Sequence, residues 1–506
     1  MPDALGEAFS IVFSPSVIGI MLLSATYGLF VGAIPGLTAT MAVALIIPFT
    51  FFMSPPVALA AISTLSAMAI FAGDIPSTLM RIPGTPASAA YVADAYALNQ
   101  RGEGSRVLGV CLVSSALGGL LGGIALILGA PTLARVAFAF TTYEYFWLAI
   151  LGLSSAVIVS QGSLAKGCFS LLLGLLLSTV GLDEVHGMAR MTFGLTDLAG
   201  GINFIPAMIG MFGLSEVLRN VTRREAVADS SHLDSGKIFQ GTLRLLRRRP
   251  GHFLRSSAIG TLIGILPGAG ADIAAWVSFA TSKKFSKTPN DYGKGSLEGV
   301  SDASAANNAS LGGAWIPALV FGIPGDAVTA IVLGVLMMKG IQPSPQIFIK
   351  QPVLLYSVYI VFFVSNLLLI PMGYLAIRCG RIIIRIPRGI LLPAILLFCM
   401  VGSYAINTSL FDIGVMLIFG VVGFFLERHG FPVGPVVLGL VLGPQVEKNF
   451  MFSVIKSDGN FMEFFSRPVA GTLGIIVSLL WLAPALLALR RWSRRRSMGL
   501  PGGRPA

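Results

Sequence analysis

Long apolar segments, most of them close to the length of a membrane helix, alternate along this chain with short polar segments. In the first half they cover residues 17–31, 37–52, 57–71, 107–130, 145–160, 164–181 and 202–218. In the second half they cover residues 258–281, 309–338, 353–377, 390–406, 413–426, 431–442 and 469–489. A helix needs about 20 apolar residues to cross a bilayer, so the pattern predicts an all-α polytopic membrane protein with about 10–14 membrane segments.

Two of these apolar stretches are interrupted in the same way. Residues 28–36 and 260–268 both read G-x-x-x-G-x-x-P-G. Proline removes a backbone donor, and glycine opens the backbone. In hydrocarbon the freed N–H and C=O groups need protein or water partners, so each break is expected to line a cavity. The pattern leaves open whether each break bends one helix or forms a hairpin.

A second pair of interruptions follows the first. Residues 76–84 and 317–325 both read P-x-x-x-x-x-I-P-G, and the segment 309–338 is expected to break at Pro317 and again at Pro324. The two ordered pairs predict two repeats, each with a Pro-Gly-broken hairpin and a second Pro-Gly-broken helix. Interrupted segments at corresponding places in two halves point to a transporter's binding site.

Composition and charge agree with a membrane protein. The 506 residues are 55% apolar and only 11% charged, with a mean hydropathy of +0.82, whereas soluble domains carry about 25% charged residues. The net charge of +12 lies in short clusters between apolar segments, which argues against nucleic-acid binding. No P-loop motif is present, so ATP hydrolysis by that route is excluded. The four cysteines have no paired spacing that would indicate a metal site or a disulfide framework.

The basic clusters also predict orientation. Nineteen of the 35 Lys and Arg residues lie in loop 219–255, in the cluster Arg378–Arg388 and after residue 489, and all three regions are expected to be cytoplasmic. Counting segments between them places the two Pro-Gly hairpins on opposite sides, as in inverted-topology repeats. The expected organisation is a first repeat at 1–218, a basic linker at 219–255, a second repeat at 256–489 and a basic tail at 490–506.

Six stretches of this sequence resemble the large membrane subunit of the tripartite tricarboxylate transporters, the TctA family. They are residues 28–52, 82–86 (Ile-Pro-Gly-Thr-Pro), 260–272, 293–300 (Gly-Lys-Gly-Ser-Leu-Glu-Gly-Val), 307–309 (Asn-Asn-Ala) and 319–325. The resemblance implies a permease for small carboxylates in the bacterial inner membrane. It also implies a small second membrane subunit (TctB-like), a periplasmic solute-binding protein (TctC-like) and a driving cation gradient.

The sequence departs from the family pattern at several positions of the expected site. The family's acid before the Asn pair is replaced by Ser304, and an acid occurs instead at Asp302. Asp326 stands where the family usually has a small hydroxyl residue, Asp74 where it is rich in glycine, and Thr38 where glycine is frequent.

An anionic substrate needs hydrogen-bond donors, and a broken helix offers the unpaired N–H groups of its new first turn. Hydroxyl and amide side chains near the breaks add further donors. The expected substrate-binding residues are Pro35, Gly36, Leu37, Thr38, Gly84, Thr85, Pro267, Gly268, Ala269, Gly270, Asn307, Asn308 and Gly325. Two alternatives stay open: the glycines permit close helix packing, or the Asn pair caps a helix.

Ionisable residues at membrane depth usually face a partner or an aqueous path. The expected cation-coupling residues are Asp74, Asp272 and Asp326, with Na+ or H+ as the coupling ion and no other cofactor. Arg81 is expected to pair with Asp74 rather than with the substrate. Asp94, Glu298 and Asp302 are either functional or part of surface loops.

The sequence therefore predicts a secondary transporter subunit and not an enzyme: cation-coupled alternating access importing di- or tricarboxylates. A passive anion channel and an intramembrane enzyme that uses Asp74 and Asp326 as an aspartyl pair are the alternatives. The sequence does not identify the carboxylate.

Overall fold

The computed structural model describes residues 2–34, 37–159, 163–183, 186–222, 238–268, 270–384 and 388–497. Nearly all of this part is helical, and its only sheet is the two-residue hairpin of β1 (Gly181–Leu182) and β2 (Ala189–Arg190). The expectation of an all-α membrane protein is confirmed at this level.

The first half of the chain supplies eleven numbered α-helices within the described residues. They are α1 (Pro2–Val12), α2 (Pro15–Gly32), α3 (Ala39–Phe51), α4 (Pro55–Ala72), α5 (Asp74–Met80), α6 (Val92–Gln100), α7 (Gly104–Ala137), α8 (Thr142–Val159), α9 (Leu164–Ser178), α10 (Phe204–Met208) and α11 (Ser215–Thr222). A π-helical turn, Ile209–Leu214, joins α10 to α11, so helix is continuous through this stretch.

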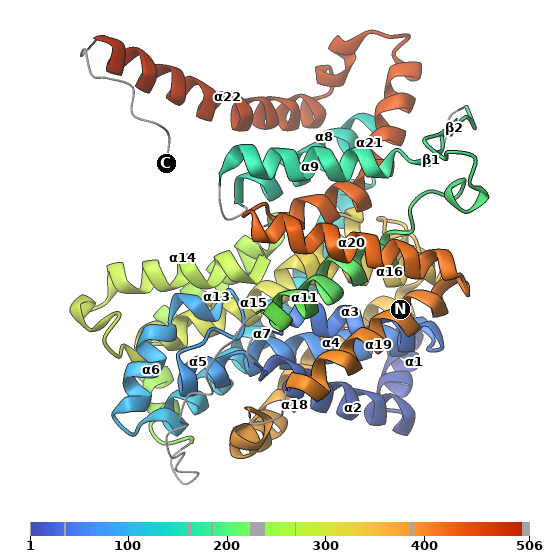
Figure 1. Cartoon of the computed structure of the whole chain (residues 1–506). Helices are drawn as coiled ribbons and strands as arrows, with labels where there is room; N and C mark the ends of the chain where they lie inside the picture. Colours follow the sequence, from blue (N-terminus) through green and yellow to red (C-terminus); the bar gives the residue numbers. More distant parts are fainter. Residues whose placement is uncertain are drawn as a thin grey trace.

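The second half supplies the remaining eleven. They are α12 (Thr242–Arg248), α13 (Pro250–Ile265), α14 (Gly270–Phe285), α15 (Leu297–Phe321), α16 (Ala327–Met338), α17 (Ile347–Lys350), α18 (Pro352–Ile384), α19 (Arg388–Asn407), α20 (Leu410–Arg428), α21 (Val433–Lys456) and α22 (Pro468–Ser497). Figure 1 shows α8, α9 and α21 side by side, with α22 beyond them, above the larger body that contains α2 to α7 and α13 to α16.

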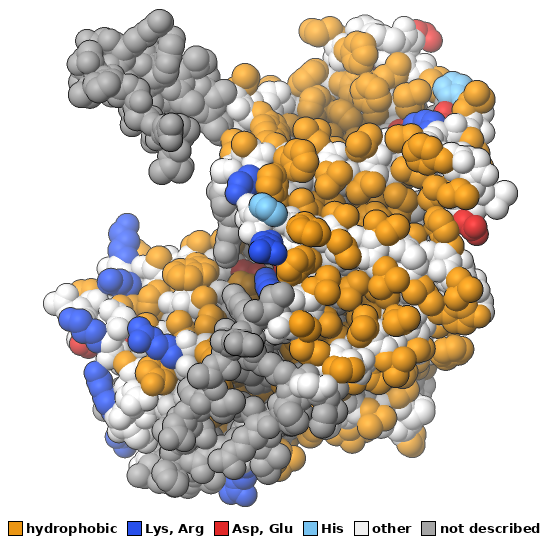
Figure 2. Space-filling model, in the orientation of Figure 1, with side chains coloured by type: hydrophobic (Ala, Val, Ile, Leu, Met, Phe, Trp, Pro, Cys, Tyr) orange, Lys and Arg blue, Asp and Glu red, His pale blue; other side chains and the backbone are white. Residues whose placement is uncertain are grey.

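Five stretches are long and apolar enough to cross a membrane: Pro15–Gly32, Pro55–Met80, Gly104–Ala137, Pro352–Gly380 and Leu410–Arg428. Several shorter apolar helices, among them Ala39–Phe51 and Ala327–Met338, accompany them. Figure 2 shows hydrophobic side chains over most of the right-hand part of one face, while Lys and Arg gather at its left. The protein is thus a multi-pass membrane protein, and the figure of about 10–14 crossings stays a prediction.

Helices end beside each of the four Pro-Gly positions. α2 ends before Pro35-Gly36, which lie outside the described residues, and α13 ends before Pro267-Gly268. α5 ends at Arg81, which has a left-handed φ of 58°, and α15 ends at Gly322 with a φ of 67°.

The expected break at Pro317 is wrong, because α15 continues through this residue to Phe321. An internal proline costs one backbone hydrogen bond and strains the preceding turn. Here the surrounding packing retains the helix, since Trp315 and Pro317 are both buried between neighbouring helices. Pro76 likewise lies inside α5.

The two G-x-x-x-G motifs pack against helix backbones in the same manner. A Cβ at Gly28 or Gly32 would come within 2.6 Å of the carbonyl oxygens of Leu65 and Ala69 on α4. A Cβ at Gly260 or Gly264 would come within 2.3 Å or 2.2 Å of those of Ala306 and Ser310 on α15. Absence of a side chain lets these backbones touch, so the close-packing alternative holds for these four glycines.

The second Pro-Gly of each half continues this packing one turn further along the same helix. A Cβ at Gly84 would lie 2.5 Å from the Cα of Gly73, four residues after Ala69. A Cβ at Gly325 would lie 2.7 Å from the Cα of Ala314, four residues after Ser310. Both halves therefore repeat one set of contacts at matching positions.

The polar residues between the apolar segments 258–281 and 309–338 belong, from Leu297 onward, to the buried helix α15. Its small residues allow α7 and α13 to approach on either side, and polar side chains bond across these contacts. Ser301 and Ser114 hydroxyls lie 2.8 Å apart, and the Ser115 hydroxyl donates to the Ser304 carbonyl at 3.4 Å.

The polar stretch after α9 forms the β hairpin, and an ion pair attaches it to α21. The Arg190 guanidinium donates to both Glu447 oxygens, at 2.5 and 3.0 Å. These hydrogen bonds raise the pKa of Arg190. Beyond the hairpin Phe193 is 85% exposed, the highest value among the large hydrophobic side chains that the structure describes.

Candidate substrate cavity

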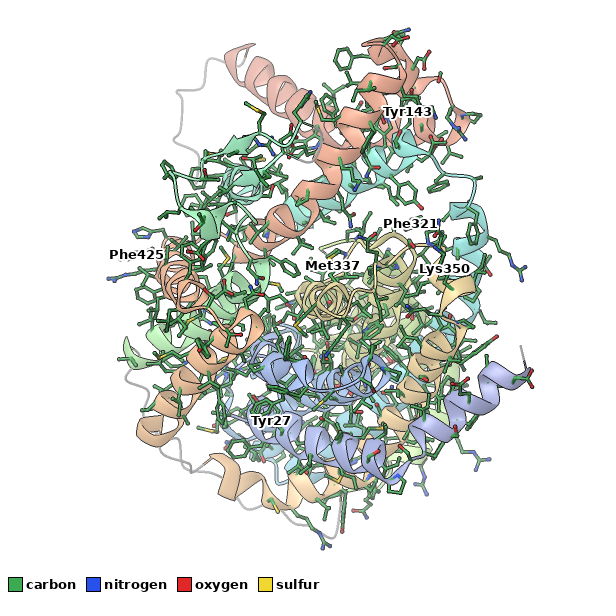
Figure 3. The ribbon with its side chains drawn as sticks, turned by 90° about the vertical axis from the view of Figure 1, so that its right-hand side faces the viewer. Tyr27, Tyr143, Phe321, Met337, Lys350 and Phe425 are labelled. Atoms are coloured by element: carbon green, nitrogen blue, oxygen red, sulfur yellow. The ribbon has the colours of Figure 1, made fainter. Side chains whose placement is uncertain are left out.

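One cavity of about 530 Å³ lies between the two halves. Its lining comes mainly from α3, the segment after α5, the π-helical turn, α11, α14, α15, α16 and the start of α21, with single residues from α4, α8 and α20. In Figure 3, Phe321 at the end of α15 and Met337 near the end of α16 lie toward the middle of the molecule, whereas Phe425 on α20 lies at its edge.

Seven of the sequence-predicted site residues line this cavity. They are Thr38, Thr85, Gly268, Gly270, Asp272, Asn307 and Asp326. They include residues that follow each of the four Pro-Gly positions, so segments far apart in the sequence meet around one space. A volume of this size is in the range of small-molecule sites, about 300–1,000 Å³.

The other predicted residues that the structure describes do not line this cavity. Leu37, Gly84, Pro267, Asn308, Gly325 and Asp74 are not among the lining residues, and Pro35, Gly36 and Ala269 lie outside the described residues. Gly325 still contributes through its backbone, because its carbonyl accepts a hydrogen bond from the Gly268 N–H at 2.8 Å. Asn308 faces away, donating to the Ser115 carbonyl and to Asn366 Oδ1, both at 2.9 Å.

Thr38 is the N-cap of α3 and presents that helix end to the cavity. Its Oγ1 accepts a hydrogen bond from the Met41 N–H at 3.2 Å. Thr40, which the sequence analysis did not select, also lines the cavity from the first turn of α3. The positive end of the helix dipole and its unpaired N–H groups are suited to a negatively charged group.

Thr85 forms a reciprocal cap with Ser88. Thr85 Oγ1 accepts from the Ser88 N–H, and Ser88 Oγ accepts from the Thr85 N–H, both at 3.2 Å. Asp326 forms the same cap with Thr329 at the start of α16: Asp326 Oδ1 accepts from the Thr329 N–H at 2.7 Å, and Thr329 Oγ1 accepts from the Asp326 N–H at 2.9 Å. These reciprocal bonds satisfy backbone donors that a helix start leaves unpaired.

Asp272 lies in the first turn of α14 and is close enough to Asp326 for their charges to interact. Gly270 explains this proximity, because a Cβ there would lie 2.9 Å from the Asp326 Cβ. Asn307 lies on α15, which packs against α14. Its side chain is 2% exposed, and its Oδ1 has no hydrogen-bond partner.

Asp74 belongs to a separate buried cluster. Its Oδ1 accepts from the Tyr91 hydroxyl at 2.5 Å and its Oδ2 from the Ser304 hydroxyl at 3.1 Å. The expected pairing of Arg81 with Asp74 is wrong, because Arg81 is exposed and stacks over the Tyr96 ring, 5.9 Å from its centroid. Asp74 and Asp326 are not hydrogen-bond partners among the described residues, so the structure does not form the aspartyl pair of the enzyme alternative.

The other intramembrane acids of the sequence analysis anchor the chain internally. Asp94 is fully buried and accepts from the N–H groups of Gly293, Gly295 and Ser296 at 2.7–2.9 Å. Glu298 and Asp302 bind the start of α13: His252 lies 3.0 Å from Glu298, and Arg255 lies 3.4 Å from Asp302. The surface-loop alternative is wrong for all three, since all are buried.

Three charged residues on the cavity wall were not among the site residues predicted from the sequence. Arg219 of α11 pairs with Glu216 on its own helix and with Glu427 of α20, the latter at 3.2 Å. Among the described lining residues Arg219 is the only basic one. The π-helical turn that precedes it also lines the cavity through Met211 and Phe212, and such turns are frequent at functional sites.

The cavity wall thus combines two kinds of group: helix N-termini and hydroxyls, which donate hydrogen bonds, and the carboxylate oxygens of acidic residues, which accept them. Donors of the first kind suit a carboxylate, and carboxylate and amide oxygens suit a hard cation such as Na+. Within the part of the chain that the structure describes, no group of three or more His, Cys, Asp or Glu residues could hold a metal ion.

Comparisons with known proteins agree on one family. The sequence pattern of the tripartite tricarboxylate transporter TctA family matches residues 18–438. An uncharacterised 52.8 kDa protein from the TAR-I ttuC′ 3′ region of Agrobacterium vitis is 34% identical over 494 residues, covering 97% of each chain. An uncharacterised protein from the TAR-II ttuC′ 3′ region of the same organism is 35% identical over 234 residues, covering 46% of this chain and 97% of its own. No solved structure matches the chain.

Proposed function

The chain belongs to the tripartite tricarboxylate transporter TctA family, and from this premise we propose that it is the permease subunit of a binding-protein-dependent secondary transporter. It imports small organic di- or tricarboxylates by cation-coupled alternating access. The observation that carries the proposal is that one cavity of about 530 Å³ is lined by residues that follow all four Pro-Gly positions.

The architecture proposed for this function is a pair of inverted-topology repeats. The repeated packing of Gly28 and Gly32 on α4, and of Gly260 and Gly264 on α15, supports two copies of one unit. The segments after each break meet around the cavity, as expected for transporters whose binding sites lie between repeats. Asp272 and Asp326 are the proposed cation-coupling residues on its wall, whereas Asp74 is enclosed in its own cluster.

The proposed setting is the bacterial inner membrane with a cytoplasmic C-terminus. A TctB-like small membrane subunit and a TctC-like periplasmic solute-binding protein are the proposed partners. The basic linker 219–255 and the basic tail after residue 489 support this orientation, because Lys and Arg are enriched in cytoplasmic loops.

Uptake into proteoliposomes tests the proposal. Vesicles containing the chain and its partner subunits are diluted into radiolabelled citrate, succinate or benzoate, with and without an inward Na+ or H+ gradient. Accumulation of one carboxylate above its external concentration, dependent on the gradient, is the expected result. Equilibration without accumulation identifies a passive channel instead, and conversion of a carboxylate by the detergent-solubilised chain identifies an enzyme.

A further inference from the structure

The contacts described above align the two halves residue by residue. Residues 34–40 correspond to 266–272, because each segment follows a G-x-x-x-G motif with matching contacts and shares the Pro-Gly step in sequence. Residues 82–88 correspond to 323–329, because Gly84 and Gly325 pack at matching positions. In this correspondence Thr40 matches Asp272, and Thr85 matches Asp326. All four residues line the same cavity.

Thr85 and Asp326 occupy the same capping position but offer opposite chemistry. Thr85 uses an oxygen lone pair to accept from Ser88, which leaves its O–H available as a donor. Asp326 uses Oδ1 for its cap, which leaves Oδ2, an acceptor, outside the cap. The same reciprocal hydrogen-bond pattern therefore presents a donor in the first half and an acceptor in the second.

The first half presents three hydroxyls, Thr38, Thr40 and Thr85, which we call the hydroxyl set. The described lining residues between 38 and 86 include no acid, and the first half's lining acid further along the chain, Glu216, pairs with Arg219. Thr38, like Thr85, accepts its capping bond and retains its O–H. The start of α3 adds the positive end of a helix dipole. Donors without a formal negative charge are what a substrate carboxylate requires.

The second half presents two carboxylates and an amide oxygen, Asp272, Asp326 and Asn307 Oδ1, which we call the oxygen set. Asn307 is the independent sign of a ligand, because this lining residue is only 2% exposed and its buried Oδ1 lacks a hydrogen-bond partner within the described part of the chain. A buried polar atom left unpaired costs about 1–3 kcal/mol. A hard cation bound by oxygen ligands would remove this cost and offset the repulsion between the two carboxylates.

We propose that the two halves of the cavity divide the ligands: the hydroxyl set binds a carboxylate group of the substrate, and the oxygen set binds Na+. This assignment rests on the proposed transport function and specifies where each ligand binds. Since the two sets face one cavity, bound Na+ and bound carboxylate attract each other, and each raises the other's affinity by the same factor.

Sodium binding can be measured without transport. The full chain, purified in detergent, is heated in increasing NaCl with choline chloride holding the ionic strength constant, because a ligand that binds the folded state raises the midpoint of unfolding. Asp326→Thr keeps a hydroxyl cap like that of Thr85, and Asp272→Asn keeps the side-chain shape. We expect each to raise the half-saturating Na+ concentration by about tenfold or more, the loss expected when one charged ligand is removed.

Thr40→Val is the matched variant in the hydroxyl set. Thr40 is chosen because, unlike Thr38, it does not cap a helix. We expect it to leave the half-saturating Na+ concentration within about twofold, and to raise by about tenfold the half-saturating concentration of the carboxylate that the wild type imports. The inference is overturned if the wild type gains no stability from Na+. It is also overturned if the Asp variants keep the wild-type response, or if Thr40→Val shifts the Na+ response as far as they do.

The two proposals fail in different ways. Absence of carboxylate uptake by wild-type proteoliposomes defeats the proposed function, while the Na+ titration in detergent still reports on the oxygen set. Gradient-driven uptake together with an unchanged Na+ response in Asp272→Asn and Asp326→Thr retains the transport function and rejects the division between the sets.

Discussion

Gly268 lies where two helix breaks meet, and its surroundings leave no space for a side chain. Its φ of 79° is in the left-handed region, and a Cβ would lie 2.3 Å from the Cα of Ala156 on α8. Its N–H also binds the Gly325 carbonyl. The identity of this residue is therefore dictated by backbone conformation and by space together.

We expect Gly268→Ala to reduce carboxylate uptake by about tenfold or more, because a shift of about 1 Å at a binding site can cost about a hundredfold in rate. Radiolabelled uptake per amount of membrane-inserted protein is the measurement. Gly251→Ala is the control, since a Cβ at Gly251 meets nothing within 4 Å. Normal uptake by Gly268→Ala would contradict a role for this turn.

Asp94 shows how a buried charge can serve structure instead of transport. Asp94→Ala would leave three backbone N–H groups of the 293–296 turn without their acceptor. We expect a loss of stability of about 3 kcal/mol or more, because removing a buried charged partner leaves unpaired donors. The midpoint of thermal unfolding in detergent measures this loss. Asp291→Ala, an exposed acid near the same turn, should leave the midpoint nearly unchanged, and an equal drop would refute the explanation.

At the scale of elements, Arg219 joins α11 to α20 beside the cavity. It lies between Glu216, whose side chain is 5% exposed, and Glu427 on the other helix. Asn220 also donates to Glu216 at 2.7 Å. The Arg219 guanidinium pairs with a carboxylate on each of the two helices. It therefore links α11 to α20, and its removal would leave both carboxylates without this cationic partner.

Arg219→Met should lower the unfolding midpoint, because it leaves the 5%-exposed Glu216 side chain without its guanidinium partner; the 35% exposure of Arg219 keeps the loss below the roughly 3–5 kcal/mol of a fully buried pair. The double variant Arg219→Met with Glu427→Gln removes one of the stranded charges, so it should recover part of the loss. Thermal unfolding of the purified chain distinguishes the two variants. If the double variant is as unstable as the single one, the bridge between α11 and α20 does not contribute as described.

The sequence predicted helix ends better than it predicted the burial of α15. Prolines and glycines act locally, so the ends of α2, α5 and α13 followed from residue type alone. The Ser, Asp and Asn content of the stretch before residue 306 gave no sign that it forms part of a buried helix. Its polarity is satisfied by partners from distant segments, such as Ser114 and Arg255, which no local pattern reveals.

The same difference between local signals and contacts from distant segments applies to the candidate site. Thr38, Thr85 and Asp326 were selected from the sequence because each follows a break. Arg219 and Thr40 were not, because their places on the wall depend on how helices pack across the molecule. Asp74, predicted to couple the cation, does not line the cavity, and its sequence position beside a break gave no sign of the hydrogen bond that it accepts from the Tyr91 hydroxyl.

At the scale of the whole molecule, the orientation in the membrane can be tested with native and introduced cysteines. Cys379 is exposed beside the basic cluster near the end of α18, and Phe193 is exposed near the β hairpin. With the other cysteines replaced by serine, a membrane-impermeant maleimide applied to intact spheroplasts should label Phe193→Cys and spare Cys379. Permeabilised cells should label both. Labelling of Cys379 in intact spheroplasts would reverse the proposed orientation.

The glycine contacts of α2 with α4 and of α13 with α15 place main chains directly against each other, without intervening side chains. Side-chain rotamers can adjust when an interface slides, but carbonyls and Cα atoms have no such freedom. The two helices of each pair must therefore move together as one rigid body. Any motion that exposes the cavity to alternate sides of the bilayer has to occur at other boundaries, such as that of α16 with α10, where Gly334 meets the aromatic side chain of Phe204.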